Sequence, residues 1–340
     1  MTKRRMTWWM MCCLLVGLCL PTGCSTIDED MSDCGQDYRL DYELKLITNL
    51  VTELETELSA QTDEPVAAAL YERLRNVFSD YAHDVNLGFY NTTPDSALSH
   101  HEEEMMNANQ STYTIYLPVK EYMHLALANI AEERVVKYID NDRCHTACLY
   151  QMEGDTLESH NTGLFTARQS MEVIENQDQS FYVPLFMANS AAALVVDTVG
   201  HPVQALHSYV TDVADAFYLR DSVYTYRRHP LIRAQEVPVE GGTQACFTAV
   251  CFPSRNVTTV RSGASPESED SYWTIQLYVT LPDGSITENL LYVREPLKAG
   301  ELKVVKVRLK ERGEVEAVSV DVGVSVTLDW KPGGEYHPEL

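Results

Sequence analysis

Apolar and polar residues alternate along several short segments in the first half of the chain. In the first of these, Tyr38–Leu46, apolar and charged residues alternate without interruption. A period of two is typical of a strand with one buried face. The same pattern, or a run rich in apolar and aromatic residues, predicts further strands at residues 84–90, 112–117, 122–129, 180–185 and 191–197.

The second half repeats this pattern more regularly. Apolar residues alternate with polar ones over 273–279, and Pro-Asp-Gly-Ser at 282–285 predicts a hairpin turn into a strand at 286–293. Strict alternation over 318–328 makes this segment the strongest strand prediction in the sequence. Further strands are predicted at residues 203–210, 216–219 and 305–309.

The period changes between Thr52 and Asp80, where a helical region is predicted. Asp63-Glu64-Pro65 is a helix start signal, because Asp suits the N-cap and Pro suits the first turn. Apolar residues then recur three and four apart over Val66–Phe78. The sequence therefore predicts a helical insertion among the first strands.

Short, turn-bounded strands with one apolar face predict a mainly β protein built from antiparallel β-sandwiches. A chain of 340 residues is longer than one hydrophobic core usually organises, so two tandem domains are expected. The turn at Gly200-His201-Pro202 is the predicted boundary. It separates an N-terminal domain, residues 37–199, which carries the helical insertion, from a C-terminal domain, residues 200–340.

Residues 1–23 are predicted to be a secretory signal peptide. Three cations at positions 3–5 precede an uncharged run at 6–20, which is too short for a comfortable spanning helix of about 20 apolar residues. Gly23-Cys24 resembles the lipobox of bacterial lipoproteins, although Pro21 stands where leucine is usual. This resemblance implies cleavage before Cys24, lipid attachment to its sulfur, and a lipidated tether over residues 24–36.

The net charge of the chain limits the classes of partner that it is expected to bind. The formal charge is −24, and loss of the three signal cations, with no anions, leaves −27 on the mature chain. Nucleic acids and anionic lipid surfaces call for clustered Lys and Arg, so neither is an expected partner. Asp28-Glu29-Asp30 behind Cys24 resembles the acidic signal that sends lipoproteins to the outer face of the outer membrane, and a solvated tether is the alternative.

Five cysteines remain as candidates for disulfide formation once Cys12, Cys13 and Cys19 leave with the signal and Cys24 is acylated. An oxidising export route favours one or two disulfides with one thiol left over. Cys144 and Cys148 could meet across a tight loop or a helical turn, whereas Cys246 and Cys251, five apart, could bond directly only if the chain turns between them. The five are Cys34, Cys144, Cys148, Cys246 and Cys251.

Nothing in the sequence nominates a catalytic centre, a cofactor or a metal. His100-His101 beside Glu102–Glu104 carries suitable metal donors, but a solvated polar segment is favoured because no zinc-protease spacing is present. Cys144-His145-Thr-Ala-Cys148 lacks the spacing of a haem or zinc motif. The 19 tyrosines could line a glycan-binding face, and filling the rims of sandwich strands is the favoured alternative.

Three segments carry a resemblance to a known family. These are Asp33-Cys34-Gly35 with the strand that follows it, residues 122–129, and the terminal Leu-Asp-Trp-Lys-Pro-Gly at 328–333. Together they resemble the fimbrillin superfamily, and within it the FimB-type anchor subunits of type V pili. The resemblance implies two transthyretin-like β-sandwiches on an outer-membrane lipoprotein that is exposed at the cell surface and lacks a cofactor.

The function implied by the resemblance is to anchor or cap the base of a fimbria by strand exchange with a fimbrillin stalk subunit. Stalk subunits of the family are trimmed after an arginine. Here Arg39 lies within the first predicted strand, where pairing would hide it, and Arg73 or Arg75 is the alternative. If the chain donated a strand, 318–328 would be the candidate. The competing hypothesis is a glycan-binding adhesive lipoprotein or a fimbrial tip subunit, with a secreted hydrolase a distant third.

Overall fold

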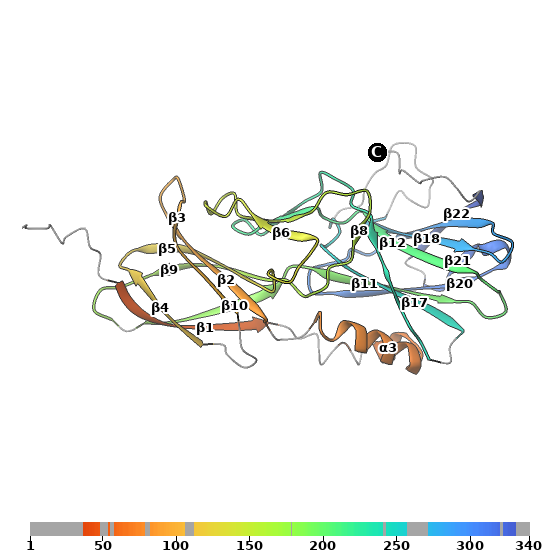
Figure 1. The fold of residues 1–340 in the computed structure, drawn as a ribbon, viewed down its shortest axis with the longest axis horizontal. Coiled ribbons are helices and arrows are strands. Elements are labelled where there is room, and N and C mark those ends of the chain that lie inside the picture. Colours follow the sequence, from red (N-terminus) through yellow and green to blue (C-terminus); the bar gives the residue numbers. More distant parts are fainter. Residues whose placement is uncertain are drawn as a thin grey trace, which may run out of the picture. The chain divides into compact units, whose positions relative to one another are not determined.

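Seven strands of the N-terminal half form one hydrogen-bonded sheet in the order β3-β2-β5-β9-β10-β1-β4 (Figure 1). The structure is a computed structural model that describes residues 37–47, 54, 58–78, 82–105, 112–177, 179–240, 243–256, 271–319 and 322–330. The strands are β1 (Asp37–Ile47), β2 (Asp84–Asn91), β3 (Leu98–Met105), β4 (Thr112–Pro118), β5 (Glu121–Ala128), β9 (Phe165–Glu172) and β10 (Gln179–Met187).

This sheet folds over on itself to make the first sandwich. Among the described residues, β10 pairs with β9 only at Phe186↔Thr166 and Met187↔Phe165. Beyond these pairs the strands diverge, so that β3, β2, β5 and β9 face β10, β1 and β4. Both halves contribute to one core, which holds Phe89 and Tyr122 from the first half and Val183 and Leu185 from the second. Along β10 these buried residues alternate with more exposed ones, whereas β2 is buried along nearly its whole length.

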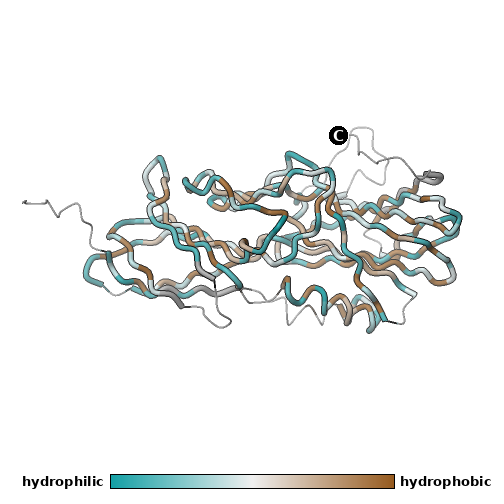
Figure 2. Tube along the Cα trace, viewed as in Figure 1, coloured by the Kyte–Doolittle hydropathy of each residue, from teal (hydrophilic) through white to brown (hydrophobic). Residues whose placement is uncertain are grey.

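Helix α3 (Glu64–Leu74) lies between β1 and β2 in the sequence but packs against strands of the C-terminal half. Its N-cap is Asp63 and Pro65 lies in its first turn, as the start signal predicted. Val66, Leu70 and Leu74 are buried and three or four residues apart, so they form one face. Figure 2 shows hydrophobic and hydrophilic stretches alternating along this helix.

Two further sheets form the second sandwich. The five-stranded sheet has the order β16-β17-β11-β20-β21, with β16 (Gln235–Val237), β17 (Gln244–Cys251), β11 (Ser190–Asp197), β20 (Leu302–Leu309) and β21 (Val315–Ala317). The six-stranded sheet has the order β22-β19-β18-β12-β15-β8, with β22 (Val322–Trp330), β19 (Ile286–Val293), β18 (Trp273–Thr280), β12 (Ala205–Thr211), β15 (Ile232–Arg233) and β8 (Leu157–Glu158). Their facing side chains form a second core around the fully buried Trp273.

A four-stranded sheet, β14-β13-β7-β6, covers the other face of the first sheet near β2 and β5. Its strands are β14 (Val223–Thr225), β13 (Ala216–Tyr218), β7 (Cys148–Gln151) and β6 (Val136–Ile139). Phe217 and Leu149 pack there with Tyr90, Leu125 and Leu127. The hairpin β13–β14, which comes from the C-terminal half of the sequence, is thereby fixed against N-terminal strands.

The prediction of a mainly β protein with a helical insertion is confirmed. Three of the strand pairings, β1 with β10, β11 with β20 and β15 with β8, are parallel rather than antiparallel. Parallel neighbours need long connections, and the partners here are far apart in the sequence. No helix among the described residues is long and apolar enough to cross a membrane.

The chain passes from the first sandwich to the second between β10 and β11. β11 pairs with β17 and β20, both from beyond residue 200, and buried Asn189 immediately precedes β11. The predicted boundary at Gly200 therefore falls after the chain has entered the second sandwich. Whether the halves before and after residue 200 act as separate domains stays a prediction.

Candidate functional site

The edges of the sheets are the candidate sites for binding another chain through its backbone. An edge strand presents unpaired N–H and C=O groups, and proteins usually protect such edges by shortness or by charge. Four of the edges, β8, β14, β16 and β21, are only two or three residues long. They offer too little backbone for a stable added strand.

The β3 edge is protected by charged and polar side chains. His100 Nε2 lies 2.7 Å from Glu102 Oε1, and His101 Nε2 lies 3.0 Å from Asn86 Oδ1. Asn86 Nδ2 also donates to Glu103 Oε1 at 2.7 Å. Figure 2 shows this strand as largely hydrophilic. These contacts pair His100 with Glu102 on the same strand and His101 with Asn86 on the neighbouring β2. No group of three or more metal donors occurs in the described residues.

The β4 edge lacks that protection. Thr112–Pro118 contains no charged residue, and β4 ends the seven-stranded sheet. Ile115 and Leu117 are fully buried in the core, whereas Thr114 and Tyr116 are exposed. Buried side chains on one face hold β4 in place while its outer edge has no neighbouring strand among the described residues. This combination is typical of a strand that accepts a partner.

Strand β1 occupies the place between β10 and β4. It runs parallel to β10, with pairs from Leu40↔Gln179 to Ile47↔Phe186. Arg39 lies inside β1, as predicted, and its exposed side chain is 3.3 Å from Asp41. Arg73 lies in α3 and Arg75 is its C-cap. The first strand of the chain is thus part of its own sheet.

The predicted C-terminal strand is β22, which is also paired. It lies antiparallel to β19, from Val322↔Val293 to Trp330↔Ile286, with one irregularity near Glu288. The candidate donor segment is therefore engaged with its own chain through β19, although β22 is the edge strand of the six-stranded sheet.

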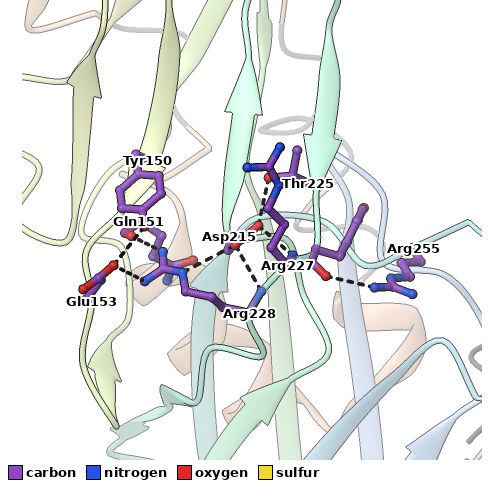
Figure 3. A network of polar contacts seen from close by, with 9 residues as sticks. Tyr150, Gln151, Glu153, Asp215, Thr225, Arg227, Arg228 and Arg255 are labelled. Carbon is purple, nitrogen blue, oxygen red and sulfur yellow. Dashed lines mark hydrogen bonds and ion pairs between the residues drawn. The ribbon is translucent and has the colours of Figure 1, made fainter. Parts of the chain in front are cut away.

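A buried carboxylate organises the β13–β14 hairpin (Figure 3). Asp215 is 2 % exposed and accepts hydrogen bonds from Thr225 Oγ1 at 2.9 Å, Arg227 N at 3.3 Å and Arg228 N at 3.2 Å. The guanidinium of Arg228 approaches Asp215 at 3.4 Å and donates to the carbonyl of Gln151 at 2.6 Å. This network joins β7, β13 and β14 and has a structural role.

No local pattern in the sequence indicates the Asp215 network. The partners of the carboxylate come from 10 to 13 positions further along the chain, and the Gln151 carbonyl lies far upstream of Arg228. Spacing rules for helices and strands do not reach such separations. Only the pairing of β13 with β7 brings these residues together.

The four cysteines within the described residues are buried, and no disulfide joins them in the structure. Cys246 and Cys251 lie on the continuous strand β17 and face different cores, so the turn needed for a direct bond between them is not present. Burial raises the pKa of Cys246 to about 11 and that of Cys251 to about 12. A bond between Cys144 and Cys148 stays a prediction. Cys24 and Cys34 lie outside the described residues.

Comparison with solved structures shows what the fold is similar to. A candidate polysaccharide-binding protein from Bacteroides thetaiotaomicron has 9 % identity and a TM-score of 0.50, covering 83 % of this chain and 98 % of its own. A candidate adhesin from Bacteroides ovatus has 11 % identity and a TM-score of 0.50, covering 89 % and 98 %. The fimbrial anchor protein Mfa2 from Porphyromonas gingivalis has 12 % identity and a TM-score of 0.46, covering 86 % and 100 %.

At these identities the two structures with a TM-score of 0.50 establish a shared fold and nothing finer. Comparison with family models and with curated proteins finds no match to the sequence.

Proposed function

We propose that this chain is a lipid-anchored outer-membrane subunit that anchors or caps the base of a fimbria, without catalytic activity, by strand exchange with a fimbrillin stalk subunit. The observation that carries the proposal is the contrast among the sheet edges. β4 is seven residues long, uncharged and open on one side among the described residues. β1 is paired on both sides, whereas β22 is also an edge strand but contains the charged residue Asp329 and is paired with β19. The fimbrial names of similar structures agree with this assignment but do not carry it.

The pairing of the terminal strands supports an acceptor role. A subunit inside a strand-exchanged fibre has to give one strand and take another. This chain keeps β22 on β19, so it has no free terminal strand to give among the described residues. It can instead accept a strand on an open sheet edge, for which the uncharged β4 is the best candidate, and a subunit that only accepts ends the fibre. The added backbone would gain ladder hydrogen bonds, with alternate side chains fixing its register.

This subunit is placed at the membrane end of the fibre because Cys24 is its predicted lipid attachment site. Each methylene of an acyl chain that enters the bilayer contributes about 0.8 kcal/mol, and one chain alone binds only marginally. Several chains on Cys24 would hold the subunit stably. The subunit would then sit at the cell surface, attached to the outer membrane without spanning it.

Deletion of the gene tests the anchoring role. We expect fimbriae to be made but released into the medium or grown to abnormal length, because their attached end is missing. A Cys24→Ser variant should give the same phenotype and lose labelling by a clickable fatty acid. Normal retention of fimbriae in the deletion strain would refute the anchor assignment.

Introduction of a charged side chain on β4 tests the acceptor edge separately. Tyr116→Lys places a cation on β4, while Tyr182→Lys places the same cation on the internal strand β10. The two tyrosines are 55 % and 47 % exposed, so they form a matched pair. Loss of fimbrial retention with Tyr116→Lys alone is expected, and equal retention in both variants would contradict pairing at β4.

A further inference from the structure

A groove of about 520 Å³ lies between strands β9 and β10 and the β13–β14 hairpin. Its volume falls within the range of about 300 to 1,000 Å³ that is usual for small-ligand sites. Phe217, Leu219 and Met187 provide apolar walls, and each is no more than 7 % exposed. Arg168 and Ser222 lie at its exposed rim.

The hairpin side of the groove is held rigidly. The Tyr224 hydroxyl donates to the Ala188 carbonyl at 2.7 Å, and the Tyr224 and Phe217 rings lie 4.5 Å apart between centroids. Arg168 Nη1 donates to the Arg220 carbonyl across the groove at 2.5 Å. These contacts tie β9 and β10 to the hairpin, so a ligand would not have to order the site. Such preorganisation lowers the entropic cost of binding.

One aromatic ring in the groove is solvent-exposed. Phe186 is 56 % exposed, although Leu185 before it is buried in the first core. It is the only large exposed apolar side chain of the described residues that lines this groove. Its neighbour across the strand pair is the polar Thr166. The ring is therefore an exposed flat apolar surface in a groove that has apolar walls and polar residues at its rim.

We propose that this groove binds a pyranose unit of a glycan. The C–H face of a pyranose carries partial positive charge and is attracted to the negative face of an aromatic ring such as Phe186. Its hydroxyls can accept from Arg168, whose guanidinium has five donors, only one of which is used by Arg220. The side chains of Gln169 and Ser222 supply further donors and acceptors.

A protein partner fits this groove less well. A stable protein interface buries about 800 Å² on each side around a core of several aromatic or aliphatic anchors. The groove offers one exposed ring, apolar walls and a polar rim, which suits a small ligand with an apolar face and polar edges. The site lies away from the β4 edge in the strand order, and the inference does not rest on the proposed fimbrial role.

A microarray of defined oligosaccharides, probed with the purified mature protein, tests the proposal. The strongest oligosaccharide is then titrated against wild type, Phe186→Ala, Arg168→Ala and the control Tyr116→Ala, an exposed aromatic of nearly equal exposure on β4. We expect at least a tenfold loss of affinity with Phe186→Ala and Arg168→Ala and none with Tyr116→Ala. Matching circular dichroism melts exclude misfolding. No oligosaccharide bound above background, or equal affinity in Phe186→Ala, would overturn the proposal.

Discussion

Removal of the Asp215 carboxylate should destabilise the protein strongly. Asp215→Ala leaves the Thr225 hydroxyl and the backbone N–H groups of Arg227 and Arg228 without their acceptor. A buried polar group that loses its partner costs about 1–3 kcal/mol. The Arg228 side chain is 32 % exposed and regains water, so its contribution is smaller. We expect a loss of about 3–4 kcal/mol in the free energy of unfolding.

Urea unfolding followed by tryptophan fluorescence and circular dichroism measures this loss. Asp221→Ala is the matched control, because Asp221 is 64 % exposed and lies 4.0 Å from Arg220. An exposed pair of this kind contributes less than about 1 kcal/mol, so the control should unfold almost like wild type. A free energy of unfolding for Asp215→Ala within about 1 kcal/mol of wild type would refute the structural role of the network.

Three further outcomes follow from the buried groups. Burial lowers the pKa of His124 to about 4 and that of His160 to about 3 in the folded protein. In the unfolded chain the pKa of both histidines is near 6.5, so the unfolded state binds their protons at a higher pH than the folded state does. Stability should be full above pH 6.5 and fall towards pH 4, and a urea midpoint that is unchanged between pH 7.5 and 5 would contradict this. Gly163→Ala should lower the melting temperature sharply, because its Cβ would overlap the Val77 carbonyl oxygen, and an unchanged melt would disprove that close approach. Cys251 should react with a thiol reagent only in denaturant, since burial raises its pKa to about 12, and rapid labelling of the folded protein would argue against its burial.

The fold could be predicted where a strand has one buried face. β1, β18, β19 and β22 follow the alternation of the sequence, and α3 follows the Asp63-Glu64-Pro65 start signal. The edge strand β3 was not predicted, because its charged residues resemble a loop when the neighbouring strand is unknown. β9 was missed for a similar reason, since its outward residues are polar and its inward ones are few.

The sites depend on pairings that no local pattern specifies. β4 is an edge strand because of the order of the seven strands in its sheet. This order depends on the pairing of β1 with β10, two strands that are separated by most of the N-terminal half of the chain. The Phe186 groove requires the β13–β14 hairpin to fold back against β9 and β10. The pairing of the apolar segment 190–197 with both β17 and β20 likewise joins residues from beyond position 240 to this segment, and no local pattern in the sequence indicates it.

The most direct test of the acceptor role is photo-crosslinking in the strain that makes the fimbriae. A benzophenone amino acid replaces Tyr116 on β4 or, as the control, Tyr182 on β10, and the adducts are identified by mass spectrometry. We predict an adduct between position 116 and a terminal segment of a fimbrial stalk subunit, with none from position 182. Adducts at position 116 that contain no fimbrial subunit would contradict the account.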